Sequence, residues 1–411
     1  MKLAAPGQPH LTYCTNIHAG ETWAEVRANL ERYVLAVRGQ VAPDRPFGVG
    51  LRLSAEAADT LARPDELAAF RDFLARHRLY VFTINGFPYG VFHGRRVKED
   101  VYLPDWLDDA RLRYTDRLAT LLADLLPAEP GLEGSVSTVP GAYKPRVRDT
   151  GDAARMAARM LRHAATLHGL HERTGKLVTL ALEPEPCCHM ETVAETIRFF
   201  EAHLFAADAV AGFARQTGLP PGAAEAALRR HLTVCFDACH MAVEFEEPHA
   251  ALRALRSAGI RVGKIQISAG LRVRVDPRDG GLRSALEPFA EGVYLHQVVE
   301  RRDGGLTRFA DLPDALATLD RGGEEVREWR IHFHVPLFRE DLGRFTSTQG
   351  YLVQVLDLLR VEAHSPHLEV ETYTWDVLPE EHRREDIVVA VARELRWVLD
   401  GLAGLPPGGE A

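Results

Sequence analysis

Eight short runs of apolar and β-branched residues recur along the whole chain, and segments with helical periodicity separate most of them. The runs lie near residues 11–17, 47–53, 79–85, 134–139, 177–183, 232–237, 262–268 and 368–372. Strands that alternate with helices form a parallel sheet, because each helix carries the chain back to the edge where the next strand starts. Eight is also the number of such strands that closes into a barrel.

The helical segments between the runs are amphipathic. The segment after Asp152 places apolar residues on one stripe and is predicted to stop at Gly175, and similar stripes run through residues 193–204 and 387–398. An open, doubly wound sheet is the alternative, but no GxGxxG motif follows the first run. The sequence therefore predicts the α/β class and a (β/α)₈ TIM barrel.

The spacing of the runs also predicts the domain organisation. No Gly/Ser-rich or Pro-rich linker divides the 411 residues, so we expect a single domain over 1–404 and a disordered tail at 405–411. The stretch 270–349 is predicted to be an insertion between the seventh and eighth strands, on the face that carries the site. Its strand-like runs 293–298 and 330–335 are expected to pair with each other and to bring His332 or His334 near the site.

Composition restricts the partners and the compartment. The formal net charge of −9 argues against nucleic acid as an electrostatic partner. No signal peptide and no stretch of about eighteen apolar residues is present, so neither secretion nor membrane insertion is expected. The five cysteines are odd in number and form no CxxC pair, which favours a cytoplasmic protein without a thiolate zinc site. The oligomeric state is left open.

Three acids stand where a predicted barrel strand ends: Glu183, Asp237 and Glu371, with Gln266 at the equivalent place on the strand between the last two. Successive side chains of a strand point to opposite faces, and this parity turns all four toward the barrel interior. Three carboxylates at one point repel one another, and a hard divalent cation resolves the repulsion. A metal site is therefore predicted at the C-terminal ends of the strands.

The same parity turns Lys264 and Glu369 inward, so we expect them to form an ion pair or to share a water inside the barrel. His240, three residues after Asp237, is a candidate contact for substrate or for a metal ligand.

The remaining candidates for substrate binding are Asn85 and His93 in the third loop, Trp106, and His334. Trp106 either anchors a loop or stacks on a sugar. His332 and His334 share one strand face and form either a second metal-binding pair or part of a lid.

The order Glu183, Asp237-x-x-His240, Gln266 and Glu371 on successive strand ends resembles the xylose isomerase-like superfamily over residues 10–400. The resemblance implies one Mn²⁺, Mg²⁺, Co²⁺ or Zn²⁺ ion held by Glu183, Asp237, Gln266 and Glu371. Many members have His where this chain has Gln266.

A narrower resemblance rests on the run from Thr83 to Gly90, on Phe92-His93-Gly94 and on the run from Val97 to Trp106. These residues resemble the metabolite traffic protein EboE family. The resemblance implies a role in making or moving a metabolite, with partners encoded in an ebo-type operon.

The leading hypothesis for function is a metal-dependent isomerase or epimerase that acts on a polyhydroxylated carbonyl compound. Glu183 or Glu371 would move a proton between carbons, and His240 would assist. One alternative is a metal-dependent phosphodiesterase like the endonuclease IV-like branch of the superfamily, which uses several zinc ions and more histidines. The other is a metabolite-binding protein without catalysis.

Overall fold

The computed structural model describes residues 1–411 except 95, 320–324, 381–382, 384 and 406–411. Most of the predicted tail therefore lies outside the described residues. Within the described ranges, no helix is both long and apolar enough to cross a bilayer.

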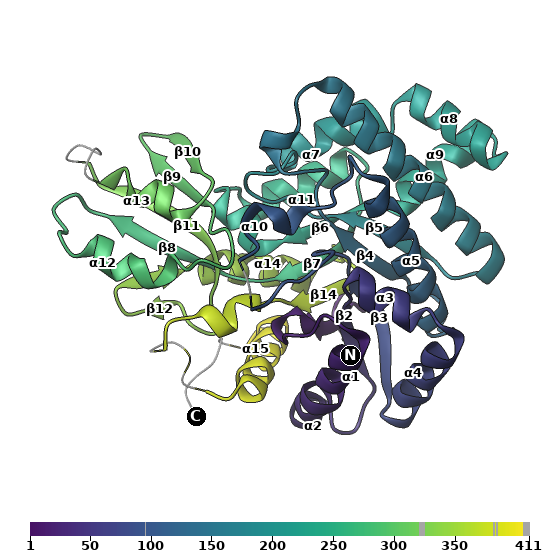
Figure 1. Ribbon diagram of the computed structural model, residues 1–411, viewed down its shortest axis with the longest axis horizontal. Coiled ribbons are helices and arrows are strands. Elements are labelled where there is room, and N and C mark those ends of the chain that lie inside the picture. The colour runs from purple at the N-terminus through teal and green to yellow at the C-terminus, as the bar shows by residue number, and fades with distance from the viewer. Residues whose placement is uncertain (95, 320–324, 381–382, 384, 406–411) are drawn as a thin grey trace.

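The core of the molecule is a barrel of eight parallel strands with helices around it (Figure 1). The strands follow the order β1-β14-β7-β6-β5-β4-β3-β2, and a parallel bridge from Cys14 to Gly50 joins the first strand to the second. The predicted (β/α)₈ TIM barrel is confirmed. Its strands are β1 (His10–Tyr13), β2 (Phe47–Arg52), β3 (Leu79–Asn85), β4 (Gly134–Thr138), β5 (Val178–Leu182), β6 (Leu232–Asp237), β7 (Val262–Ile267) and β14 (His367–Val370).

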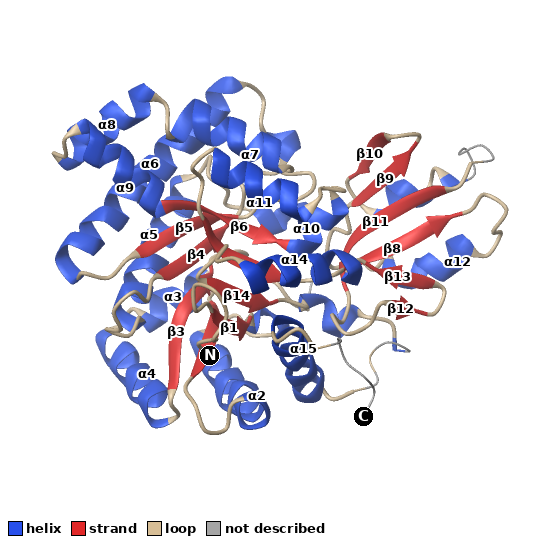
Figure 2. Cartoon of the chain, turned by 180° about the vertical axis from the view of Figure 1, so that it is seen from behind, coloured by secondary structure: helices blue, strands red, loops and turns tan. Residues whose placement is uncertain are grey.

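Helices cover the outside of the barrel, as both views of the chain show (Figures 1 and 2). The stripe after Asp152 forms α6, whose N-terminus Asp149 caps and which ends at Gly175, at a φ of 69°. The helices are α1 (Trp23–Asn29), α2 (Leu35–Val41), α3 (Ala55–Leu61), α4 (Pro64–Arg76), α5 (Asp109–Leu125), α6 (Thr150–Thr174), α7 (Val193–Phe199), α8 (Ala207–Thr217), α9 (Pro221–His231), α10 (Ala238–Val243), α11 (Pro248–Ser257), α12 (Leu282–Leu286), α13 (Leu312–Leu316), α14 (Gln349–Val361) and α15 (Ile387–Leu402).

The junction between the first two strands is tight. The Thr12 hydroxyl donates to the Gly48 carbonyl at 2.7 Å and accepts from the Gly50 N–H at 3.1 Å. A Cβ atom on Gly50 would lie 2.1 Å from Oε1 of Glu369 and 2.6 Å from the Tyr13 carbonyl oxygen. Only glycine fits at this position, because a side chain there would enter the filled barrel interior.

The barrel interior holds a buried ion pair. Lys264 Nζ lies 2.5 Å from Glu369 Oε2, and both side chains are 0% exposed. Lys264 also donates to Ser137 Oγ at 3.3 Å, across the barrel. The predicted inward parity of the seventh and eighth barrel strands is confirmed.

A second, antiparallel sheet follows the seventh barrel strand and lies beside the barrel (Figure 1). Its order is β10-β9-β11-β8-β13-β12. The sheet consists of β8 (Gly270–Val275), β9 (Val298–Arg302), β10 (Gly305–Phe309), β11 (Arg327–His334), β12 (Asp341–Leu342) and β13 (Phe345–Ser347).

The two strand-like runs of this region differ in how much of each forms a strand. The run 330–335 lies largely in β11 and pairs with β9, where Ile331 faces Val298. The run 293–298 is a strand only at Val298. The predicted pairing of the two runs is confirmed at this end, where the Gln297 carbonyl also accepts from the His332 N–H at 2.8 Å. The first backbone groups of the run bond elsewhere: the Val293 carbonyl accepts from Val97 and Lys98, and the Glu291 carboxylate accepts from the backbone N–H of Val293. These backbone groups are therefore not free to join a ladder.

Candidate metal centre and ligand cavity

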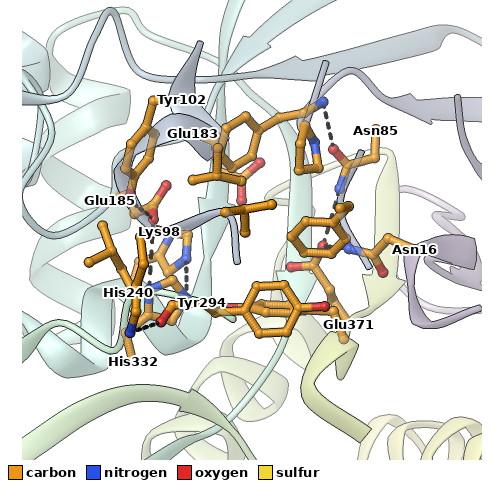
Figure 3. Close-up of a pocket in the computed structure, with 17 residues that line it drawn as sticks. Asn16, Asn85, Lys98, Tyr102, Glu183, Glu185, His240, Tyr294, His332 and Glu371 are labelled. Atoms are coloured by element: carbon orange, nitrogen blue, oxygen red, sulfur yellow. Dashed lines mark hydrogen bonds and ion pairs between the residues drawn. The ribbon is translucent and has the colours of Figure 1, made fainter. Parts of the chain in front are cut away.

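A cavity opens at the C-terminal ends of the barrel strands, with about 510 Å³ of space not filled by atoms, part of it open to solvent. Figure 3 shows Glu185, His240 and His332 on one side of it and Asn16, Asn85 and Glu371 on the other. The first strand ends at Tyr13, and the turn Thr15–Ile17 that follows brings Asn16 to the cavity.

Three predicted metal-site acids meet here: Glu183 and Glu371 line the cavity, and Asp237 lies next to them. Carboxylate oxygens of Glu183, Asp237 and Glu371 all lie within 4.8 Å of one another, and all three residues are buried. Burial, and then the neighbouring Glu371 and Asp237, raise the pKa of Glu183 well above its ordinary value. Burial, and then Asp237, do the same to the pKa of Glu371. Three ionised carboxylates are therefore unstable here without a compensating positive charge.

The hydrogen bonds of the three acids leave some carboxylate oxygens unpaired, and these could bind such a charge. Glu371 Oε1 accepts from Asn16 at 2.8 Å and from Asn85 at 3.1 Å. Asp237 Oδ1 accepts from the backbone N–H of His240 at 2.8 Å and from the Ser268 hydroxyl at 2.9 Å. Oδ2 of Asp237 and Oε2 of Glu183 are buried without a hydrogen-bond partner. Buried carboxylate oxygens without donors are suited to a hard divalent cation, so these residues fit the predicted metal.

Gln266 is fully buried and lies beside Asp237 in the sheet register. Its Oε1 accepts from the Cys235 thiol at 3.1 Å, and its Nε2 has no partner. Turning the amide over would exchange the two atoms and leave Oε1 unpaired. In that orientation Gln266 offers the oxygen that the sequence assigned to the metal.

A second group of possible ligands adjoins the acids. His240, His332 and His334 lie in overlapping sets with Asp237 or Glu185, in which ligand atoms are within 4.8 Å of one another. His332 and His334 come from β11, so the second sheet contributes two side chains to a centre that begins in the barrel. Burial lowers the pKa of His334 to about 4 and that of His332 well below its ordinary value. Both rings are therefore neutral at neutral pH.

The tautomers of these histidines follow from their partners. Nδ1 of His240 lies 2.9 Å from the Pro184 carbonyl, and Nδ1 of His334 lies 2.9 Å from the Glu371 carbonyl. Nδ1 of His332 lies 2.8 Å from Gln297 Oε1. These oxygens only accept, so each Nδ1 carries a proton, and the neutral rings of His332 and His334 present a bare Nε2.

The Nε2 atoms of His240 and His332 face each other. Nε2 of His240 and Nε2 of His332 are 3.1 Å apart, and Nε2 of His334 is buried without a partner. Two lone pairs at that distance repel unless a proton or a cation lies between them. Neutral imidazoles oriented by carbonyl oxygens are typical ligands of Zn²⁺ and related ions.

Glu185 and its partners set the orientation of His332. Gln297 Nε2 donates to Glu185 Oε1 at 3.1 Å, to Tyr102 Oη at 2.7 Å and to the Pro186 carbonyl. The Tyr102 hydroxyl donates to Glu185 at 2.6 Å. These bonds fix the Gln297 amide, so its oxygen faces the His332 ring.

The structure places the other predicted residues in different surroundings. Asn85 lines the cavity. His334 does not line it, but its ring lies next to Asp237 and His240. His93 instead lines a neighbouring cavity, because its loop is held by the bond from the Phe92 N–H to Glu21. Trp106 is fully buried and donates to Thr138 Oγ1 at 3.2 Å, so its ring is not available to a sugar.

Sequence reasoning did not select several residues of the cavity. Glu185 lies two residues after Glu183, and the strand parity used for Glu183 would have suggested it. No periodic signal marks the loop and insertion residues, because the chain path alone brings them to the barrel mouth. Besides Glu185, the cavity residues missed are Asn16, Lys98, Tyr102, Tyr294 and Tyr373.

No family model matches the sequence, and no curated protein matches it either. Among solved structures, the probable 3-DHS dehydratase AsbF of Bacillus anthracis is 11% identical, with a TM-score of 0.47 and coverage of 95% of this chain and 98% of that chain. A xylose isomerase-like TIM barrel protein from Mycobacterium smegmatis in complex with magnesium is 11% identical, with a TM-score of 0.49 and coverage of 98% and 99%.

The IolI protein with a binding zinc atom is also 11% identical, with a TM-score of 0.45 and coverage of 96% of this chain and 98% of that chain. These identities and TM-scores carry no weight for activity. The fold rests on the strand pairing of this chain, and its function has to be argued from the geometry of the cavity.

Proposed function

We propose that the protein holds divalent cations in this cavity and acts as an isomerase or epimerase on a polyhydroxylated carbonyl compound. The convergence of buried Glu183, Asp237 and Glu371, with two carboxylate oxygens left unpaired, carries this proposal. His240, His332 and His334 offer a second position next to the first. The acids favour Mg²⁺ or Mn²⁺, and the imidazoles favour Zn²⁺, Co²⁺ or Mn²⁺.

The residues of the cavity have distinct tasks in such a reaction. A bound cation would make the C–H next to a carbonyl more acidic and stabilise the negative charge that develops. Glu183 and Glu371 stand on the cavity floor, where either carboxylate can accept a proton from one carbon and return it to the next. Asn16 and Asn85 hold Glu371 in place, and His240 is positioned to bond a substrate hydroxyl.

Metal analysis and proton exchange test this proposal. Protein purified without chelators should contain cations, and Glu371→Gln should weaken their binding by at least tenfold while leaving the circular dichroism spectrum unchanged. Glu246→Gln is the matched control, because Glu246 is a mostly buried acid outside the cavity. The wild type should exchange solvent deuterium into a C–H of a sugar or cyclitol, and the Glu371 variant should not. Equal exchange rates in both would remove Glu371 from catalysis.

A specific observation also favours a second function. The sequence suggested a site poorer in histidine than that of the endonuclease IV-like branch, but β11 adds His332 and His334 to His240. A cluster of imidazoles and carboxylates suits hydrolysis of a phosphodiester by bound zinc. Release of nitrophenol from bis(p-nitrophenyl) phosphate by the zinc-loaded protein, without deuterium exchange into any polyol, would favour this function over isomerisation.

The likeness to the EboE family suggests that the ligand is a metabolic intermediate that proteins encoded in an ebo-type operon make or move. Its motif residues Phe87, Phe92, Val97 and Val101 line the cavity, which supports a ligand-binding role for the motif. Ligand binding without exchange and without ester cleavage would indicate a carrier rather than an enzyme.

A further inference from the structure

Three aromatic side chains from separate parts of the chain form one wall of the cavity, which is called the aromatic wall below. Phe92 belongs to the loop after β3, Tyr294 to the segment before β9, and Tyr373 to the segment after β14. Their ring centroids lie 4.9 to 5.4 Å apart in every pairing, and Val97 packs in the same small cluster, which is distinct from the main core. These residues therefore form one aromatic cluster that lines the same cavity as Glu183 and Glu371, and the Tyr373 hydroxyl lies 3.5 Å from Nε2 of His332.

The wall offers no positive charge to a ligand. Lys98 is the one lysine or arginine among the described residues that line the cavity. Its ammonium donates to the Tyr294 carbonyl at 2.6 Å, to the Glu291 carbonyl at 3.1 Å and to Asp311 Oδ2 at 2.7 Å. An ammonium has three N–H donors, and all three are used within the protein. Nothing on this wall remains to neutralise a phosphate group.

A second cavity adjoins the first at Tyr294. It has about 900 Å³ of space not filled by atoms, part of it open to solvent. Its lining is mixed, because Val293 and Val377 share it with the acids Glu21, Glu25 and Asp376. Tyr294 lines both cavities, so the ring forms the boundary between them.

We propose that the ligand is an uncharged polyhydroxylated compound with an apolar substituent, and that Phe92, Tyr294 and Tyr373 bind this substituent. This inference rests on the proposed function, since the hydroxyl groups would face the acids and histidines of the floor. It excludes a sugar phosphate whose phosphate group sits against the aromatic wall, where the buried charge would lack a partner.

Calorimetric titration of the full-length protein with matched ligands tests the proposal. The probes are methyl glycosides, hexyl glycosides and 6-phosphates of glucose, galactose and mannose. For at least one sugar, the hexyl glycoside should bind about tenfold or more tighter than the methyl glycoside, because burial of only two methylene groups suffices for this gain. The matching 6-phosphate should bind more weakly than the methyl glycoside. A tighter phosphate, or no hexyl preference in any series, would overturn the proposal.

Variants locate the substituent. Phe92→Ala should abolish the hexyl preference, and the milder Val97→Thr should reduce it, which provides a test if the first variant folds poorly. Phe245→Ala is the control for unspecific adsorption, because this partly exposed ring lies outside both cavities. An unchanged preference in folded Phe92→Ala or Val97→Thr would contradict the assignment. Failure of the proposed function would appear separately, as absence of deuterium exchange despite an intact hexyl preference.

Discussion

Replacing Lys264 with Met tests how the barrel interior is stabilised. Lys264 and Glu369 are both 0% exposed, and their charged atoms are 2.5 Å apart. Loss of the ammonium would leave the Glu369 carboxylate buried without its partner. Breaking a buried pair in this way costs about 3–5 kcal/mol, whereas removing both charges costs much less. Glu369→Gln in the same chain should therefore recover most of the stability that Lys264→Met removes.

Urea unfolding of the wild type, both single variants and the double variant measures this coupling. Fluorescence and circular dichroism must give coincident transitions, so that free energies can be compared. We expect a coupling energy of about 2 kcal/mol or more. The control pair is Arg71 and Asp124, whose side chains are 49% and 46% exposed, and its coupling should stay within about 0–1 kcal/mol. A cost below about 1 kcal/mol for Lys264→Met, or additive single effects, would refute the reasoning.

Three further results are expected. Burial raises the pKa of the Glu394 carboxyl from 4.5 to about 7. The protonated carboxyl therefore stabilises the fold below pH 4.5, and this stabilisation is lost as the pH rises through 7. When the free energy of unfolding is measured against pH, Glu394→Gln should remove about 3 kcal/mol of this pH dependence. Gly50→Ala should reduce soluble expression sharply, whereas Gly39→Ala, where a Cβ meets nothing within 4 Å, should raise the melting temperature. Lys98→Met should lower the free energy of unfolding by about 1–3 kcal/mol and speed proteolysis near residues 290–311, because three hydrogen bonds are lost. An unchanged cleavage rate would show that Lys98 does not hold this segment in place.

The barrel could be predicted from the sequence because its signals are local. A strand's parity is fixed by the period of two, so the inward positions of Lys264 and Glu369 followed once the strands were placed. The same rule gathered Glu183, Asp237 and Glu371 at one end of the barrel. The end of α6 at Gly175 was predictable because a left-handed residue favours glycine.

The rest of the site depends on contacts between distant segments. Nothing near Phe92, Tyr294 or Tyr373 in the sequence signals that the three rings meet, because each lies in an irregular segment. The run 293–298 has the composition of a strand, yet only its end pairs with the run 330–335, because Lys98 and Glu291 bond the backbone groups of Val293. His332 and His334 share a strand face as expected, but their approach to His240 depends on how the second sheet packs against the barrel.

The cavity draws its polar groups from both ends of the chain, and this has a consequence for synthesis on the ribosome. Asn16 emerges early, but its partner Glu371 is separated from it by 355 positions. One edge of the first strand also stays unpaired until β14 has been synthesised. A nascent chain can therefore bury Glu183 and Asp237 only beside an open edge. All three acids of the proposed cation site come together only after the C-terminal strand has left the exit tunnel.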